Sequence, residues 1–149
     1  MTETFKLEMT RMFKAEPAKV YEAWARAELL KRWLLPHDSF KAEAKTEVTP
    51  GGEFRLDMAG RIGNDDVSGY ATGDYREVIP GERLAFTWNW HNKLTSEVMP
   101  ETLVTVAFAA KDGGTELRLA HDRFITSGLR DEYASGWLNC FKNLDALLD

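Results

Sequence analysis

The feature that most constrains this chain is a segment in which every second residue has a large apolar side chain. These residues are Leu84, Phe86, Trp88 and Trp90, and their spacing of two is the period of a strand with one buried face. A second apolar pattern, centred on Trp137, repeats every three to four residues and indicates an amphipathic helix. Because each pattern needs a partner to cover its apolar side, we expect a sheet that packs against this helix.

The composition bounds the partners that the chain can have. Its 149 residues are 44% hydrophobic and 29% charged, as in a globular protein, and we expect one domain over residues 1–149. The net charge is −5 and no block of basic residues occurs, so we expect no nucleic acid partner. No segment approaches the ~20 consecutive apolar residues that span a bilayer, so we also expect no membrane insertion.

The cysteine content and the N-terminal residues predict a cytoplasmic protein. Cys140 is the single cysteine and cannot form an intrachain disulfide. Residues 1–4 have neither the basic nor the apolar region of a secretory signal. Cys140 falls on the apolar face of the C-terminal helix, where a buried small hydrophobe is the expected role.

The periodicities predict an α+β protein with one strand, two short helices, six further strands and a long helix. Short turns, among them Asn64-Asp65, imply an antiparallel meander, and one longer loop runs from Asn92 to Glu101. The last helix would place Asn139 and Asn143 on its solvent face. The expected strands are 4–13, 40–48, 52–60, 67–78, 82–92, 102–110 and 114–123, and the expected helices are 17–25, 27–34 and 128–148.

Residues on the inward faces are candidates for lining a cavity between the sheet and the long helix. Aromatic walls bind apolar rings well, although the same residues can simply fill a core. Tyr70 and Tyr75 lie on one strand with opposite parity, so one of them should face inward. The cavity candidates are Trp33, Phe54, Leu56, Met58, Tyr70, Tyr75, Trp88, Trp90, His121, Phe124, Trp137, Cys140 and Phe141.

Among the titratable candidates, His121 is the one best suited to bind a ligand or to transfer a proton. Its parity with Leu117 and Leu119 predicts an inward imidazole close to the mouth of the cavity, where it could bond a ligand or move a proton. Alternatively, a backbone carbonyl or a neighbouring side chain satisfies it. Arg11 poses a similar choice, since it could bind an anionic ligand group or pair with an interior acid.

The sequence contains no pattern that indicates a metal, a cofactor or a catalytic nucleophile. No His, Cys or carboxylate residues have zinc-ligand spacing, and no phosphate-binding loop or dinucleotide fingerprint occurs. A Ser-His-Asp order and a nucleophile elbow are also missing. We therefore expect no metal and no cofactor, and we assign no catalytic residue.

Several short sequence words occur in an order that is characteristic of one family. They are RMFKAEP at 11–17, VYEAW at 20–24, LKRW at 30–33, PGG at 50–52, EVIPGERL at 77–84 followed by FTW at 86–88, GTEL at 114–117, His121, Phe124 and GW at 136–137. In this order the chain resembles, nearly end to end, the family related to the C-terminal domain of the Hsp90 ATPase activator. That family lies within the START-like (SRPBCC) helix-grip superfamily.

The resemblance implies a curved seven-stranded antiparallel sheet around a long C-terminal helix, with a cavity that in relatives holds hydrophobic or amphipathic small molecules. We therefore expect this chain to bind such a molecule. One alternative is a stress-response interaction module that contacts an Hsp90-type chaperone, although we expect no counterpart of the additional N-terminal domain of the activator. A second is a cavity-based enzyme, such as a cyclase, dehydratase or hydrolase, in which His121, Tyr70 or Tyr75 moves a proton. Contact with a second copy, through the outer sheet face or an edge strand, is a further alternative.

Overall fold

The computed structural model describes residues 3–149, so the first two residues of the expected domain lie outside it. It confirms the α+β helix-grip fold and the predicted order of elements. These are β1 (Phe5–Phe13), α1 (Pro17–Ala25), α2 (Ala27–Trp33), β2 (Lys41–Thr46), β3 (Glu53–Ile62), β4 (Asp65–Ile79), β5 (Arg83–Asn92), β6 (Thr102–Lys111), β7 (Gly114–Phe124) and α3 (Ser127–Leu148).

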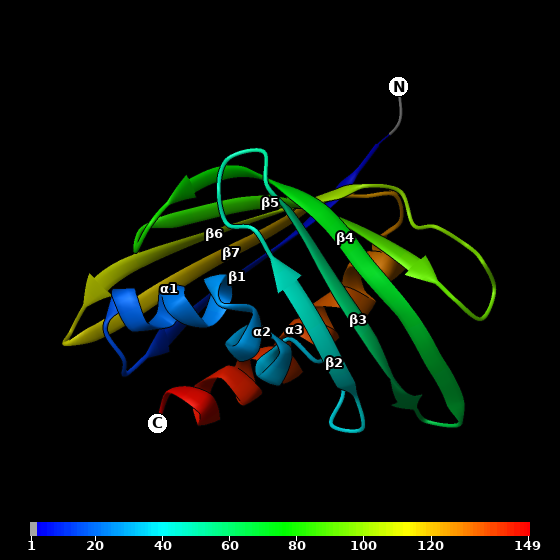
Figure 1. The fold of residues 1–149 in the computed structure, drawn as a ribbon, viewed down its shortest axis with the longest axis horizontal. Coiled ribbons are helices and arrows are strands. Elements are labelled where there is room, and N and C mark those ends of the chain that lie inside the picture. The colour runs from blue at the N-terminus through cyan, green and yellow to red at the C-terminus, as the bar shows by residue number, and fades with distance from the viewer. Residues whose placement is uncertain (1–2) are drawn as a thin grey trace.

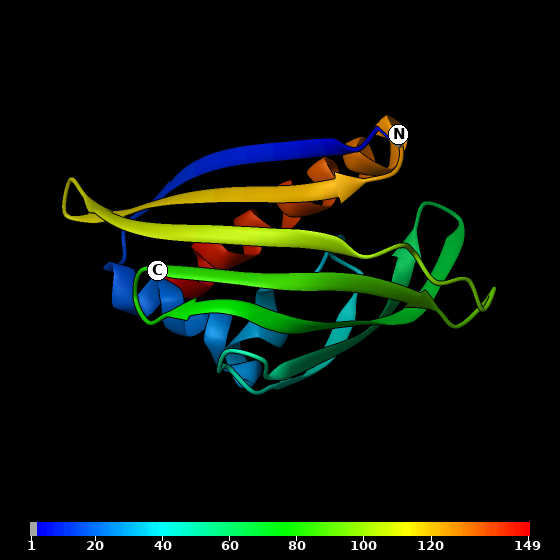
Figure 2. The ribbon, with the colours of Figure 1, turned by 90° about the horizontal axis from the view of Figure 1, so that it is seen from above.

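The seven strands form one antiparallel sheet that curves around α3. Their order is β1-β7-β6-β5-β4-β3-β2, so β2 to β7 form a meander and β1 pairs with the last strand. Figure 1 shows the strands arching over α3, with α1 and α2 beside the C-terminal half of that helix. The view from above in Figure 2 shows the long strands crossing α3, which is coloured orange to red.

One hairpin differs from its predicted boundaries. Strands β3 and β4 extend to Ile62 and Asp65, which pair with each other, so the turn is Gly63-Asn64 instead of Asn64-Asp65. Gly63 has a φ of 62°, a left-handed conformation that costs glycine little because it has no Cβ. A two-residue turn of this kind matches the strand twist and lets both strands continue to the tip.

Helix α3 is held on two of its sides. It begins where the Thr126 side chain accepts a hydrogen bond from the Leu129 amide at 3.1 Å, and the apolar stripe around Trp137 packs beneath the sheet. The prediction that Asn139 and Asn143 face solvent is wrong. Their amides donate to the carbonyls of residues 35 and 33, at 2.9 and 3.4 Å, and so satisfy backbone oxygens at the end of α2.

Tryptophans from the two short helices fill one end of the space between sheet and α3. The rings of Trp24 and Trp33 lie 4.6 Å apart, and Trp24 stacks on Trp137 at 5.8 Å. The Trp33 indole N–H donates to the carbonyl of Ala23 at 2.8 Å, so this buried polar group is satisfied. Within residues 3–149, no helix is both long and apolar enough to cross a membrane.

Candidate functional site

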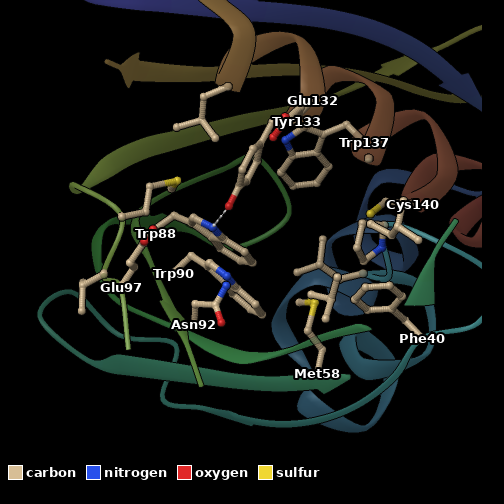
Figure 3. Close-up of a pocket in the computed structure, with 18 of the residues that line it drawn as sticks. Phe40, Met58, Trp88, Trp90, Asn92, Glu97, Glu132, Tyr133, Trp137 and Cys140 are labelled. Atoms are coloured by element: carbon tan, nitrogen blue, oxygen red, sulfur yellow. Dashed lines mark hydrogen bonds between the residues drawn. The ribbon is translucent and has the colours of Figure 1, made fainter. Parts of the chain in front are cut away.

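A cavity of about 590 Å³ lies between α3 and the strands β3 to β5. This volume is typical of small-molecule sites. Figure 3 shows its walls, which come from the sheet, from α3, from the β5–β6 loop and from the segment between α2 and β2. The lining residues are Leu34, Pro36, Phe40, Met58, Ile62, Val67, Trp88, Trp90, Asn92, Glu97, Val98, Met99, Pro100, Ile125, Leu129, Glu132, Tyr133, Gly136, Trp137 and Cys140.

Two glycines let aromatic walls lie directly against the sheet. A Cβ on Gly69 of β4 would be 2.6 Å from a ring carbon of Trp90 and 2.2 Å from the carbonyl oxygen of His91. A Cβ on Gly60 of β3 would be 2.4 Å from the ring of Phe40. Because real Cβ atoms do not approach so closely, each ring occupies space that only glycine leaves free. The positions of Phe40 and Trp90 in the wall therefore depend on Gly60 of β3 and Gly69 of β4.

Tyr133 brings a polar group from α3 into the wall of the cavity. Its hydroxyl oxygen accepts a hydrogen bond from the Trp88 indole N–H at 3.1 Å, so its own hydrogen must point elsewhere. Among residues 3–149 that hydrogen has no acceptor. Burial raises the pKa of Tyr133 to about 12, against the lowering effect of the Trp88 bond and with a further rise from the Glu132 charge. At neutral pH the phenol is therefore a hydrogen-bond donor.

His121 is fully buried behind the cavity wall, so the prediction that it lies at the mouth is wrong. The Trp137 indole N–H donates to Nδ1 of His121 at 3.1 Å, which leaves Nε2 to carry the proton. Nε2 donates to the Thr102 hydroxyl at 2.8 Å, and that hydroxyl donates to the Trp88 carbonyl at 3.1 Å. Burial lowers the pKa of His121 to about 3. The imidazole is thus neutral, and it orients Trp137, which lines the cavity.

The two tyrosines of β4 face opposite ways, as their parity requires. Tyr75 is the inward one, and its ring packs against Phe54 and Phe86 at 5.9 and 6.0 Å. Burial raises its pKa. Tyr70 is on the outer face, where it stacks on His91 at 4.4 Å under the Arg55 guanidinium. Its choice as a cavity residue is therefore wrong, and the proton-transfer roles considered for His121, Tyr70 and Tyr75 have no geometric support at this cavity.

The structure divides the remaining candidates between the cavity wall and the packed core. Met58, Trp88, Trp90, Trp137 and Cys140 line the cavity. The others are buried in the hydrophobic core and do not line the cavity; they are Trp33, Phe54, Leu56, Phe124 and Phe141. Phe124 supports the wall from behind, since its ring lies 5.3 Å from that of Tyr133.

Sequence patterns missed the part of the lining that comes from the β5–β6 loop and from the first turns of α3. Val98, Met99 and Pro100 line the cavity but belong to no periodic segment. The available signal was a run of three successive apolar residues near the end of the loop. Tyr133 lies one turn before Trp137 on the same helix, and that spacing could have placed it in the wall.

The structure shows the surroundings of two further residues, Arg11 and Cys140. Arg11 does not line the cavity but pairs with Asp145 of α3 at 3.7 Å; because the Asp145 side chain is 48% exposed, the partner is a surface acid and not the interior acid that was expected. Burial raises the pKa of the Cys140 thiol to about 12, so the thiol is protonated. In the described part of the chain, no three His, Cys, Asp or Glu residues come together as metal ligands would.

A curved antiparallel sheet that grips a C-terminal helix, with a cavity between them, defines the class of START-like helix-grip proteins. The chain belongs to one family of this class, the activator of Hsp90 ATPase homolog 1-like proteins, whose family model matches residues 14–149. This confirms the resemblance found in the sequence.

A curated relative carries the name of the family. The activator of 90 kDa heat shock protein ATPase homolog 1 from Mus musculus is 24% identical over 137 residues. The match covers 90% of this chain and 34% of the mouse protein, so the chain spans about a third of the length of that relative.

Solved structures from bacteria share the fold over almost the whole chain. An uncharacterized protein from Rhizobium leguminosarum is 23% identical, with a TM-score of 0.81 over 98% of this chain and 95% of its own. The AHSA1 protein from Silicibacter pomeroyi is 20% identical, with a TM-score of 0.80 over 97% of each chain. A protein from Rhodobacter sphaeroides is 28% identical, with a TM-score of 0.76 over 96% of this chain and 91% of its own.

Proposed function

We propose that this protein binds a small hydrophobic or amphipathic molecule in the cavity between the sheet and α3. The observation that carries the proposal is a largely apolar cavity of about 590 Å³ with a phenol donor in its wall that has no acceptor among residues 3–149. Such a combination is typical of ligand sites, in which apolar walls supply affinity and a few polar groups fix orientation.

The walls favour a ligand with a flat apolar body. Trp88 and Trp90 come from β5, and Tyr133 and Trp137 come from α3, so rings enter the cavity from both sides (Figure 3). Burying ~200 Å² of apolar ligand surface would contribute up to about 5 kcal/mol at ~25 cal/mol/Å². The Tyr133 hydroxyl could donate to a carbonyl or hydroxyl oxygen of the ligand.

The test is to add lipids, sterols and planar aromatic compounds to the protein and follow thermal stability and tryptophan fluorescence. A molecule that binds the native state alone must raise the Tm. Fluorescence should change as well, because Trp88, Trp90 and Trp137 line the cavity. A panel in which no class of compound changes either signal would refute the proposal.

A pair of variants on α3 localises the binding. Leu129→Trp places a large ring in the cavity wall and should abolish the Tm shift. Leu138→Trp introduces the same side chain on the outer side of the helix, where Leu138 is 56% exposed, and should leave the shift intact. Equal binding by both variants would place the ligand elsewhere.

Family membership supports a second candidate, a stress-response module that contacts an Hsp90-type chaperone. The name of the mouse relative describes activation of the 90 kDa heat shock protein ATPase, and this chain matches about a third of that protein. The test is to measure ATP turnover by an Hsp90-type chaperone with and without this protein, together with co-elution on a sizing column. An unchanged rate without co-elution would remove this candidate.

A further inference from the structure

The charged residues that line the cavity are both acidic. Glu97 comes from the β5–β6 loop and Glu132 from the second turn of α3, and no lysine or arginine is among the lining residues. In Figure 3 Glu97 lies on the side of the cavity opposite Phe40 and Cys140, and both glutamates are exposed, so their charge lies at the rim of the cavity. Within residues 3–149, neither glutamate forms an ion pair.

The basic residues nearest in sequence are engaged away from the cavity. Lys93, at the start of the loop, pairs with Asp57 on the outer sheet face at 3.5 Å. Arg130 pairs with Asp131 at 3.1 Å, and its guanidinium lies over the ring of Phe5. The cavity therefore presents negative charge without a compensating cation in its wall.

The aromatic walls also favour a cationic ligand. The face of an indole or phenol ring carries partial negative charge and attracts a cation, most strongly where water is excluded. Trp88 and Trp90 supply such rings to the same cavity. A ligand carboxylate could accept one hydrogen bond from Tyr133, but it would share the field of Glu132, which already disfavours a phenolate at that position.

We propose that the cavity selects amphiphiles whose polar end is a cation, such as an alkylammonium group, and discriminates against the corresponding carboxylates. This inference rests on the proposed ligand-binding function and adds the chemical class of the ligand. The apolar body lies between α3 and the sheet, and the cationic end lies toward Glu97 and Glu132.

The test compares three compounds that share one apolar body and differ in charge. They are (2-naphthylmethyl)trimethylammonium, 2-naphthalenemethanol and 2-naphthoate, with affinity measured by isothermal titration calorimetry at low and high salt. We expect the ammonium compound to bind about tenfold more tightly than the alcohol. The carboxylate should bind more weakly than the alcohol, and salt should reduce both differences because it screens charges at the cavity mouth.

A charge-matched pair of double variants assigns the selectivity to the two glutamates. Glu97→Gln with Glu132→Gln should bring the affinities for the ammonium compound and the alcohol to within about threefold of each other. Glu53→Gln with Glu82→Gln removes the same net charge at exposed residues outside the cavity and should preserve the tenfold difference.

The outcomes separate this inference from the function on which it rests. Equal affinity for the alcohol and the ammonium compound would overturn the cation selectivity and leave the binding function standing. Loss of the preference in both double variants would also overturn it, because overall charge would then explain the effect. Failure of all three compounds and of the wider ligand panel would overturn the binding function and the inference together.

Discussion

The indole nitrogen of Trp88 and the hydroxyl oxygen of Tyr133 are 3.1 Å apart and connect β5 to α3 along one side of the candidate cavity. The two residues are 45 positions apart in the chain, so the bond forms only when the helix seats in the sheet. Trp88 is also held through its carbonyl by Thr102, which accepts from His121. The wall on this side is thus one hydrogen-bonded unit built from β5, β6, β7 and α3.

Replacing Tyr133 with phenylalanine should destabilise the protein by about 1–2 kcal/mol, because the Trp88 N–H then has no acceptor in a poorly hydrated place. Urea denaturation measures the free energy of unfolding. Tyr70→Phe is the matched control, since the Tyr70 hydroxyl makes no hydrogen bond among the described residues and should change stability little. Equal losses in the two variants would mean that the Trp88 bond contributes nothing.

Acidification should destabilise the protein through His121. Its pKa is about 3 in the folded protein and near 6.5 in an unfolded chain, so between these values only the unfolded chain binds the proton. The free energy of unfolding should therefore fall as pH is lowered, at a slope that approaches about 1.4 kcal/mol per pH unit. Urea denaturation at several values between about pH 4.5 and 6.5 measures this slope.

Variants assign the slope to His121. His121→Gln removes the titrating group and should flatten the slope, whereas His37→Gln at an exposed position should not. The carboxyls of Asp38, Asp57 and Asp74 have pKa values lowered mainly by hydrogen bonds, so their contribution is lost chiefly at lower pH than this window. A slope that persists in His121→Gln would contradict the assignment.

The sequence could predict which side chains share a face of a strand, but not what that face meets. Trp88 faces inward because alternation along a strand is a local property of the backbone. Leu56 and Met58 share one face of β3, yet Leu56 is enclosed in the core and Met58 lines the cavity. The difference depends on how α3 and the short helices pack against the sheet, and the residue pattern within β3 does not contain that information.

Some cavity residues could not be predicted from the sequence for a second physical reason. Glu97 and its loop neighbours take their place from the path between β5 and β6, where no repeating geometry links sequence position to direction. Tyr70 is a different case, because it is a predicted cavity residue that lies on the outer face of the sheet. Its opposite parity to Tyr75 allows only one of the two to face inward. Deciding between them required the register of β4 against its neighbours, which is a tertiary property.

Substitution of Gly69 with alanine should destabilise the protein by about 1–3 kcal/mol and displace Trp90, because the added methyl group meets the backbone of His91 and the indole ring. Gly128→Ala is the control with the opposite sign. A Cβ there has nothing within 4 Å, and alanine in the first turn of α3 should be neutral or stabilise by up to about 1 kcal/mol. Urea denaturation of both variants checks the prediction, and an unaffected Gly69→Ala would show that the strands can separate freely at this point.

Cys140 should report directly on the state of the cavity. It is the single cysteine, it lines the cavity, and burial raises its pKa to about 12. At pH 8 we expect iodoacetamide to alkylate the native protein about a thousand times more slowly than the protein in urea, because the thiolate is the reacting form. Mass spectrometry follows the modification, and a molecule that occupies the cavity should slow it further by excluding the reagent. Rapid stoichiometric alkylation of the native protein would contradict the buried position of this thiol, and an unchanged rate with a bound ligand would place that ligand outside the cavity.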